Sequence, residues 1–331
     1  MKNIHSHRKD EHVSLAEKFY QDTAHAGFDQ VQLFPDALPE LSVEAIDLST
    51  SLAGSIIPFP FFIQAMTGGS SYTGKLNARL AHLAKQTGLA MAVGSQSVAI
   101  KYPELADSFK IVREVNPNGM ILANIGADSS VQSAQTAVQM IDANALQLHI
   151  NVAQELVMPE GDRQFNYLDQ IKAIVSALDV PVIVKSVGGG MSSRDVQKLK
   201  NCGVEFVDVG GKGGTNFIQI ENARRHQKDF DFMTDLGLTT VDSLRAVQNC
   251  GLSVTATGGI RSAADVIKSL ALGADNVGIA GYFLHNLLHL SDAEMIELVE
   301  QMKYHLRALM VLTGTQNIRD LSDQNLYQSK L

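Results

Sequence analysis

The chain has 331 residues, of which 45% are hydrophobic and 19% charged, a composition typical of a globular protein with one large core. Its formal net charge of −8 argues against nucleic-acid binding, which needs a basic face, and it requires any anionic ligand to be held by local positive groups. The longest apolar stretch, residues 56–66, contains two prolines and is too short to span a bilayer, so we expect no membrane partner.

The two cysteines, Cys202 and Cys250, cannot build a disulfide framework or a metal cluster. Residues 1–22 are charged throughout and contain no apolar core of a signal peptide. These features together predict a cytoplasmic protein.

From residue 56 on, eight short β-like runs alternate with helix-like segments, after an N-terminal stretch whose only helix-like piece is residues 15–21. Most of the runs are continuously apolar, which is the pattern of parallel strands covered on both faces. Strands are expected at 59–65, 90–93, 120–125, 145–150, 180–187, 204–209, 252–256 and 276–279. Helices are expected at 75–86, 103–115, 131–141, 167–178, 193–201, 239–248, 263–272 and 291–312.

Eight βα units in one chain predict an α/β fold of the (β/α)8 TIM-barrel type. A doubly wound sheet is the alternative, but it normally uses fewer strands. We divide the chain into an N-terminal arm that also covers the barrel bottom (1–55), the barrel (56–313) and a C-terminal tail (314–331). Within the barrel, residues 216–237 form a long polar connection, and connections of that length are lids, binding loops or disordered segments.

Two glycine-rich loops follow consecutive expected strands. Residues 210–215 read Gly-Gly-Lys-Gly-Gly-Thr, and residues 257–261 read Thr-Gly-Gly-Ile-Arg. Glycine lets backbone N–H groups approach an oxygen-rich ligand closely, and the N-terminus of a following helix adds positive potential. The repeated pattern predicts a phosphate-bearing cofactor on the C-terminal face of the barrel.

A polar cluster follows the fourth expected strand, at the barrel end where active sites assemble. His149 and Asn151 share one face of that strand, and Gln154 and Glu155 come next on the loop. A histidine, two amides and a carboxylate so close together could bind a polyanion with a hard metal ion. The alternative is a core histidine beside a solvated acid.

Lys185 ends an otherwise apolar strand. Because an unpaired buried charge is costly, this lysine must be paired, functional or extended to the barrel rim. If functional, it could neutralise a reduced flavin ring, bind a phosphate or form a Schiff base.

The N-terminal arm carries a dense run of basic residues that includes Arg8 and Lys9. Charge runs this close to a terminus are usually only solvated. An acidic protein that binds phosphate-bearing ligands nevertheless needs local cations, and this arm could supply them.

Over nearly its whole length the chain resembles the type 2, FMN-dependent isopentenyl-diphosphate isomerases. The motifs most specific to them are His-Arg-Lys-Asp-Glu-His at 7–12 and His-Ile-Asn-Val-Ala-Gln-Glu at 149–155. Met-Thr-Gly-Gly at 66–69 and Val-Lys-Ser-Val-Gly-Gly-Gly-Met-Ser at 184–192 also match. The two glycine loops are shared by many FMN barrels and identify the cofactor more than the reaction.

The resemblance implies a set of site residues. FMN would be held by Met66, Thr67, Gly68, Ser95, Asn124, Lys185 and Thr215, and its phosphate by Gly259, Ile260, Arg261, Ala280 and Gly281. The isoprenoid diphosphate would be bound by Arg8, Lys9, Ser95, Gln96, Ser97, His149, Asn151 and Gln154, with Mg²⁺ on Glu155. Some members of the family carry arginine in place of Ser97, so its contact would be weaker. The catalytic residues would be Gln154, His149 and Lys185.

The resemblance also implies the reaction, which interconverts isopentenyl and dimethylallyl diphosphate by adding one proton and removing another. Reduced FMN would act as the acid and base, because no ordinary side chain easily protonates an alkene. Lys185 would stabilise the anionic reduced ring, and Mg²⁺ would neutralise the diphosphate. NADPH would reduce the flavin, and we expect a homo-oligomer, a tetramer or an octamer.

Two other functions stay open. An FMN oxidoreductase of the 2-hydroxy-acid oxidase or IMP dehydrogenase type would use a loop histidine with a nearby arginine, or a nucleophilic cysteine, and the loop at 210–215 contains neither histidine nor cysteine. A flavin-binding barrel without catalysis would not need acid, amide and basic residues around its cofactor.

Overall fold

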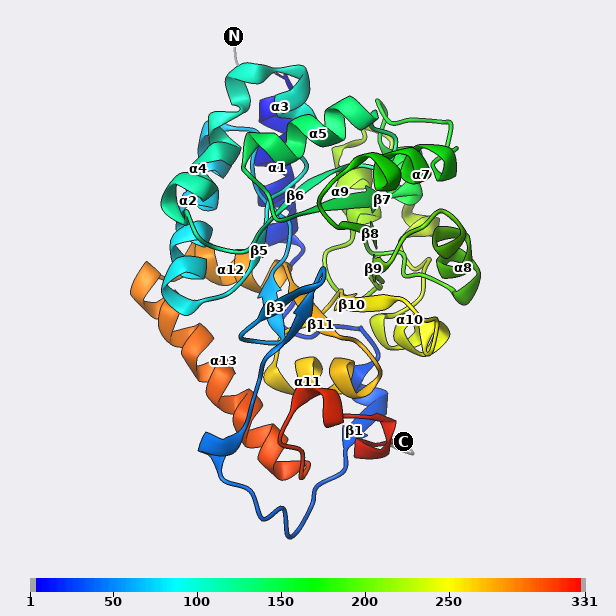
Figure 1. Ribbon diagram of the computed structural model, residues 1–331. Coiled ribbons are helices and arrows are strands. Elements are labelled where there is room, and N and C mark those ends of the chain that lie inside the picture. The colour runs from blue at the N-terminus through cyan, green and yellow to red at the C-terminus, as the bar shows by residue number, and fades with distance from the viewer. Residues whose placement is uncertain (1–3, 329–331) are drawn as a thin grey trace.

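The computed structural model describes residues 4–328, which form a closed barrel of eight parallel strands (Figure 1). The strands are β4 (Phe61–Ile63), β5 (Met91–Ala92), β6 (Ile121–Gly126), β7 (Ala145–Ile150), β8 (Val182–Ser186), β9 (Phe206–Asp208), β10 (Ser253–Thr257) and β11 (Asn276–Ile279). Because β11 pairs with β4 and closes the sheet, the (β/α)8 prediction is confirmed and the doubly wound alternative is wrong.

The expected helices form close to their expected bounds, because several begin at serine caps that the sequence provides. Ser70, Ser192, Ser262 and Ser291 each open a helix with a reciprocal capping box. These helices are α2 (Ser71–Thr87), α4 (Asp107–Val115), α5 (Val131–Met140), α7 (Leu168–Ala177), α8 (Ser193–Asn201), α10 (Thr240–Val247), α11 (Ala263–Ala271) and α13 (Asp292–Leu312). The 3₁₀ turn η3 (Pro103–Leu105) precedes α4. None of the helices among residues 4–328 is both long and apolar enough to cross a bilayer.

Four short helices in the βα connections were not expected: α3 (Ser97–Lys101), α6 (Val152–Val157), α9 (Phe217–Arg224) and α12 (Gly281–His289). The interpretation of residues 216–237 as a long polar connection therefore needs correction, since it contains α9 and the 3₁₀ turn η4 (Asp231–Met233). The side chain of Asn216 caps α9, and the helix buries Ile218, Ile220 and Glu221. Helix α9 therefore buries two apolar side chains and one carboxylate beside the mouth of the barrel.

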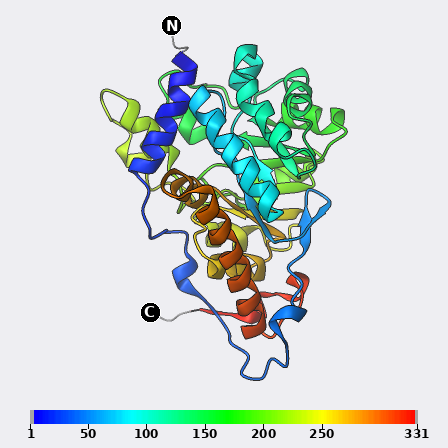
Figure 2. The same ribbon diagram turned by 90° about the vertical axis from the view of Figure 1, so that its left-hand side faces the viewer.

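The N-terminal arm is more helical than expected. Helix α1 spans Ile4–Lys18, whereas only residues 15–21 had a helix-like pattern. It packs against α2, α9 and α12, and Figure 2 shows it beside α9 and α2. The basic residues of the arm are therefore carried on a helix over the C-terminal ends of the strands.

The opposite end of the barrel is filled by a hairpin of β2 (Thr50–Leu52) and β3 (Ser55–Ile57). Leu52 and Ile57 pack there against Phe62 of β4 and Ile183 of β8. The chain end returns to the arm, where β12 (Leu326–Gln328) pairs with β1 (Val31–Leu33). The remaining 3₁₀ turns are η1 (Phe28–Gln30), η2 (Val43–Ala45), η5 (Ile318–Asp320) and η6 (Asp323–Asn325). Because this end of the barrel is filled, a ligand site is expected at the other end, beneath α1.

Candidate functional site

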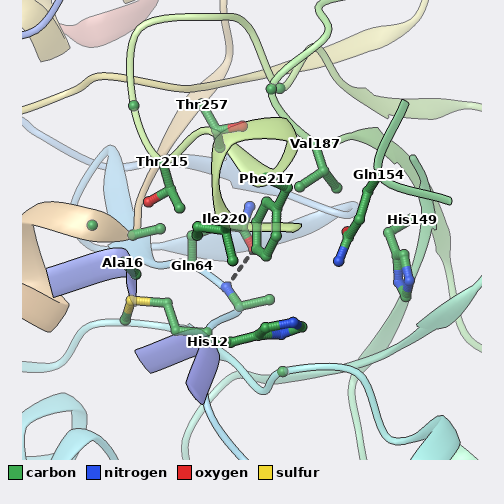
Figure 3. A pocket seen from close by; sticks show the side chains of 18 of the residues that line it. His12, Ala16, Gln64, His149, Gln154, Val187, Thr215, Phe217, Ile220 and Thr257 are labelled. Atoms are coloured by element: carbon green, nitrogen blue, oxygen red, sulfur yellow. Dashed lines mark hydrogen bonds between the residues drawn. The ribbon is translucent and has the colours of Figure 1, made fainter. Parts of the chain in front are cut away.

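A cavity of about 380 Å³ opens at the C-terminal ends of the strands, beneath α1 (Figure 3). It brings together residues from the arm and from nearly every strand end. The expected site residues that line it are Arg8, Lys9, Met66, Gly68, Ser95, Ser97, Asn124, His149, Gln154, Glu155, Lys185, Thr215, Gly259, Ile260, Arg261, Ala280 and Gly281. Thr67, Gln96 and Asn151 do not line it.

Thr67 and Gln96 are buried behind the cavity wall. The Thr67 hydroxyl donates to Asn77 Oδ1 at 2.5 Å. Gln96 is fully buried, and its Oε1 accepts the Asn124 backbone N–H at 3.0 Å. In this arrangement the Thr67 and Gln96 side chains bond inside the wall, where they support the loop at Met66 and strand β6 at Asn124.

The two glycine loops pack backbone to backbone, which only glycine permits. Gly258 has φ +106°, and a Cβ there would lie 2.0 Å from the Gly211 carbonyl oxygen. Gly259 has φ +72°, and its Cβ would lie 2.7 Å from the Gly213 carbonyl oxygen. The first turn of α12 begins beside them at Gly281, where helix N–H groups lack intrahelical acceptors. This cradle, which we call the glycine cradle (residues 210–215, 257–261 and 280–281), fits the phosphate of FMN.

Arg261 connects the glycine cradle to the arm. Its guanidinium donates to the Gln21 carbonyl oxygen, at 2.9 Å from Nε and 2.6 Å from Nη2. It also lies 4.8 Å from the centre of the Tyr20 ring. The Arg261 side chain therefore holds the segment just after α1, and the Arg261 backbone stays in the glycine cradle.

Lys185 is 6% exposed and faces Asp208, a fully buried residue that the sequence analysis missed. Burial lowers the pKa of Lys185 while Asp208 opposes that shift, and burial raises the pKa of Asp208. The Asp208 carboxylate also accepts hydrogen bonds from Gln64 Nε2 at 2.7 Å and from Thr257 Oγ1 at 2.5 Å. The sequence signal that could have found it is an aspartate near the end of the mostly apolar run at 204–209.

His149 is held neutral. Burial, with the nearby charges of Lys185 and Lys9, lowers its pKa to about 3. Its Nδ1 lies 2.8 Å from Asn124 Oδ1, so Nδ1 donates and Nε2 is left as an acceptor. In Figure 3 the side chains of His149, Gln154 and His12 extend into the same opening.

Arg8 and Lys9 are cations short of partners. Among residues 4–328, Arg8 Nε is buried without a hydrogen-bond partner, and Arg8 Nη1 lies 3.4 Å from Glu160 Oε1. Lys9 Nζ donates to the Ser95 carbonyl oxygen at 3.4 Å, and burial followed by the charge of Arg8 lowers the pKa of Lys9 to about 8. Such a pair would be stabilised by an anion between the arm and the loop that carries Ser95 and Ser97.

Gln154 is oriented by a buried carboxylate that the sequence analysis also missed. Gln154 Nε2 donates to Glu221 Oε1 at 2.9 Å, and Asn151 Nδ2 donates to Gln154 Oε1 at 2.7 Å. Asn151 also caps α6 and lines an adjoining cavity of about 500 Å³. Glu221 was overlooked because residues 216–237 carried no helical prediction.

Glu221 carries its charge in a fully buried position. Burial alone would raise its pKa, but His12, Gln154 and Arg224 together hold it at about 2. His12 Nε2 lies 2.9 Å from Glu221 Oε1, and Arg224 Nη1 donates to Oε2 at 2.5 Å. Burial lowers the pKa of His12 and so favours its neutral form. Arg224 therefore supplies the permanent positive charge beside Glu221.

Glu155 lies among other carboxylates. Burial and the charges of Asp162 and Asp128 raise its pKa, although its Oε2 accepts the Asp162 N–H at 2.9 Å. Burial and the same three acids raise the pKa of Tyr167 to about 12. A hard divalent cation such as Mg²⁺ prefers oxygen ligands, and one bound to Glu155 would relieve this repulsion.

The chain is similar in sequence to one protein family and to curated relatives. The family described as FMN-dependent dehydrogenase matches residues 109–328. The chain is 51% identical to the isopentenyl-diphosphate delta-isomerase of Latilactobacillus sakei subsp. sakei (strain 23K), over 96% of this chain and 92% of the relative. It is 47% identical to the isopentenyl-diphosphate delta-isomerase of Listeria monocytogenes serotype 4b (strain CLIP80459), over 96% and 90%.

Solved structures with a similar fold are more distant in sequence. A soluble mutant of the membrane-associated (S)-mandelate dehydrogenase from Pseudomonas putida has a TM-score of 0.69 at 17% identity, covering 99% of this chain and 100% of that one. A mandelate oxidase bound to benzaldehyde has a TM-score of 0.64 at 16% identity, covering 96% and 90%. These two likenesses establish the barrel fold alone.

Proposed function

The chain belongs to the type 2 isopentenyl-diphosphate delta-isomerases, within the FMN-dependent dehydrogenase family, and on this premise we propose that isomerisation takes place in the cavity beneath α1. The observation that carries the proposal is the presence of two separate anion-binding places in one cavity. The glycine cradle offers backbone N–H groups, and Arg8 with Lys9 offers half-buried cations. A flavin phosphate and a substrate diphosphate need such a pair.

FMN fits the side of the cavity that contains the glycine cradle. Met66, Gly68, Ser95, Asn124, Lys185 and Thr215 would hold the rest of the molecule. Once reduced, FMN supplies the acid and base strength that the protonation and deprotonation of an allylic system require. Lys185, fixed by Asp208, supplies positive charge at the strand end where an anionic ring would be stabilised.

The protein's own side chains would bind and orient the isoprenoid diphosphate. Arg8 and Lys9 would contact it from the arm, and neutral His149 would offer Nε2 as an acceptor without adding charge. Ser97 can offer only a hydroxyl, which is 3.1 Å from that of Ser95. Glu155 would hold Mg²⁺ against the diphosphate.

Gln154 would stand beside the reacting carbons with its amide fixed by Glu221 and Asn151. Helix α1 covers this part of the cavity and would keep water from it. NADPH as the reductant of the flavin, a tetrameric or octameric assembly and a cytoplasmic location remain predictions.

The decisive experiment is anaerobic incubation of the protein with FMN, NADPH, Mg²⁺ and isopentenyl diphosphate. We expect dimethylallyl diphosphate to form, and omission of NADPH or of Mg²⁺ to suppress it. Oxidised, FMN-saturated protein offered 2-hydroxy acids should not reduce its flavin. Flavin reduction by those acids without isoprenoid turnover would favour the oxidoreductase alternative, whereas FMN retention with neither reaction would favour a non-catalytic flavin barrel.

A further inference from the structure

Three metal-ligating side chains meet outside the cavity, where the end of α1 lies against α12. Glu17 Oε1 is 3.0 Å from His285 Nδ1 and 2.8 Å from His289 Nε2. All three ligand atoms lie within 4.8 Å of one another. Figure 1 shows α12 next to the lower end of α1. Nothing in the proposed isomerase chemistry uses these residues.

The two histidines are presented for joint binding by the helix itself. His285 and His289 are four residues apart on α12, so both rings lie on one helix face. The His285 ring stacks on Tyr20 at 4.0 Å with an angle of 3° between the planes. That stacking fixes the His285 ring plane with Nδ1 directed at Glu17.

The Glu17 carboxylate already faces both histidine rings. Burial acts to raise its pKa, but the hydrogen bonds and charges of His289 and His285 outweigh burial and lower it. Its two oxygens accept from His285 Nδ1 at 3.0 and 3.1 Å. A metal ion placed between these three groups would replace their mutual hydrogen bonds with stronger bonds.

We propose that Glu17, His285 and His289 form a transition-metal site that binds Zn²⁺ or a similar borderline cation. Two imidazole nitrogens and one carboxylate oxygen are a common three-ligand set for Zn²⁺, with water or another ligand completing the tetrahedron. Metal–ligand distances of about 2.0–2.1 Å place ligand atoms roughly 3.3 Å apart, which side-chain rotation from the present positions can reach. Mg²⁺ prefers oxygen ligands in an octahedron and is a poor competitor here.

A metal bound at this site would link two separate parts of the chain. Glu17 belongs to the arm and the histidines belong to the barrel, so the metal ties α1 to α12. Arg261 contacts Tyr20 and the Gln21 carbonyl oxygen nearby, just beyond the same end of α1. A bound ion therefore restrains the helix that carries Arg8 and Lys9, whatever reaction the cavity supports.

The test is calorimetric titration of Zn²⁺ into tag-free, FMN-loaded protein in the presence of saturating Mg²⁺, which blocks the oxygen-rich site at Glu155. We expect one Zn²⁺ per chain. His289→Gln and Glu17→Gln should each weaken binding by about 100-fold or more, because loss of even an outer-shell partner of a ligand costs 10–100-fold. His305→Gln, which changes an exposed histidine on α13, should bind Zn²⁺ as the parent does.

Amide hydrogen exchange gives a second readout that a surface histidine would not produce. Zn²⁺ should slow exchange in residues 4–18 of the parent and of His305→Gln but not of His289→Gln. An unchanged flavin spectrum shows that each variant is folded. The proposal is overturned if Zn²⁺ binds His289→Gln and Glu17→Gln as tightly as the parent, if the parent binds no Zn²⁺, or if binding leaves exchange of α1 unaltered.

Discussion

Lys185 Nζ lies 3.9 Å from Asp208 Oδ2, and the two residues are register partners at the ends of the neighbouring strands β8 and β9. Asp208 is fully buried and Lys185 nearly so. Neither charge could be kept there alone, because an isolated buried ion is strongly destabilised. The pair therefore places one cation at the base of the cavity, where it can act on a bound anion without moving.

Lys185→Ala should reduce isomerase turnover much more than FMN retention. Loss of one positioned electrostatic stabiliser costs on the order of 10²–10³ in rate. FMN retention should change little, because the glycine cradle holds the phosphate. The measurement is anaerobic turnover at saturating substrate alongside flavin binding. Lys172→Ala, which removes an exposed lysine on α7, is the control. Unchanged turnover of the reduced, saturated Lys185→Ala enzyme would refute the role.

Asp208→Asn should lower stability, because it leaves Lys185 buried without its counter-charge. Breaking a buried ion pair on one side typically costs about 3–5 kcal/mol. The double variant Lys185→Met, Asp208→Asn should be more stable than Asp208→Asn alone, since it removes the stranded charge. Urea unfolding of the flavin-free protein measures both. Equal stability of the single and double variants contradicts the coupling.

The strand and helix pattern of this chain could be predicted because it depends on local signals. Apolar runs located the eight strands, and serine caps located the starts of several helices. Asp208 and Glu221 could not be predicted, because their importance comes from partners far away in sequence, at positions 185 and 12. Gln96 was assigned to the substrate from the family resemblance, but its side chain is buried behind the cavity wall and accepts the Asn124 backbone N–H.

Glu155→Gln should sharply raise the Mg²⁺ concentration needed for activity while the FMN spectrum stays unchanged. The amide keeps the shape of the side chain but removes the anionic ligand that Mg²⁺ prefers. The measurement is a Mg²⁺ titration of turnover at fixed isopentenyl diphosphate. Glu104→Gln, a change in an exposed carboxylate of the 3₁₀ turn η3, is the control. A Mg²⁺ titration of Glu155→Gln that overlays that of the parent shows that Glu155 is no ligand.

His149 should make the protein less stable as the pH falls below neutrality. Its pKa is lowered from 6.5 to about 3 by burial and by Lys185 and Lys9, so between these values the unfolded chain binds a proton that the folded protein does not. Stability contributed by this residue is present above pH 6.5 and is lost as the pH falls through that value. The loss should be about 2 kcal/mol between roughly pH 8 and 5. Unfolding of His149→Gln should lack this component, whereas His305→Gln should keep it; parallel pH profiles for all three proteins contradict the assignment.

Arg8→Ala should raise the Michaelis constant for isopentenyl diphosphate by about tenfold to hundredfold, since a charge-assisted contact to phosphate is worth roughly 1.5–3 kcal/mol. The reason is structural: Arg8 Nε has no hydrogen-bond partner within residues 4–328, and Arg8 Nη1 lies 3.4 Å from Glu160 Oε1. FMN affinity should hardly change, because the flavin phosphate is expected on the glycine cradle. Steady-state kinetics and flavin titration measure the two effects separately, with Arg194→Ala on the exposed face of α8 as control. If Arg8→Ala leaves the Michaelis constant unchanged, or weakens FMN binding equally, then α1 only covers the cavity and the diphosphate binds elsewhere.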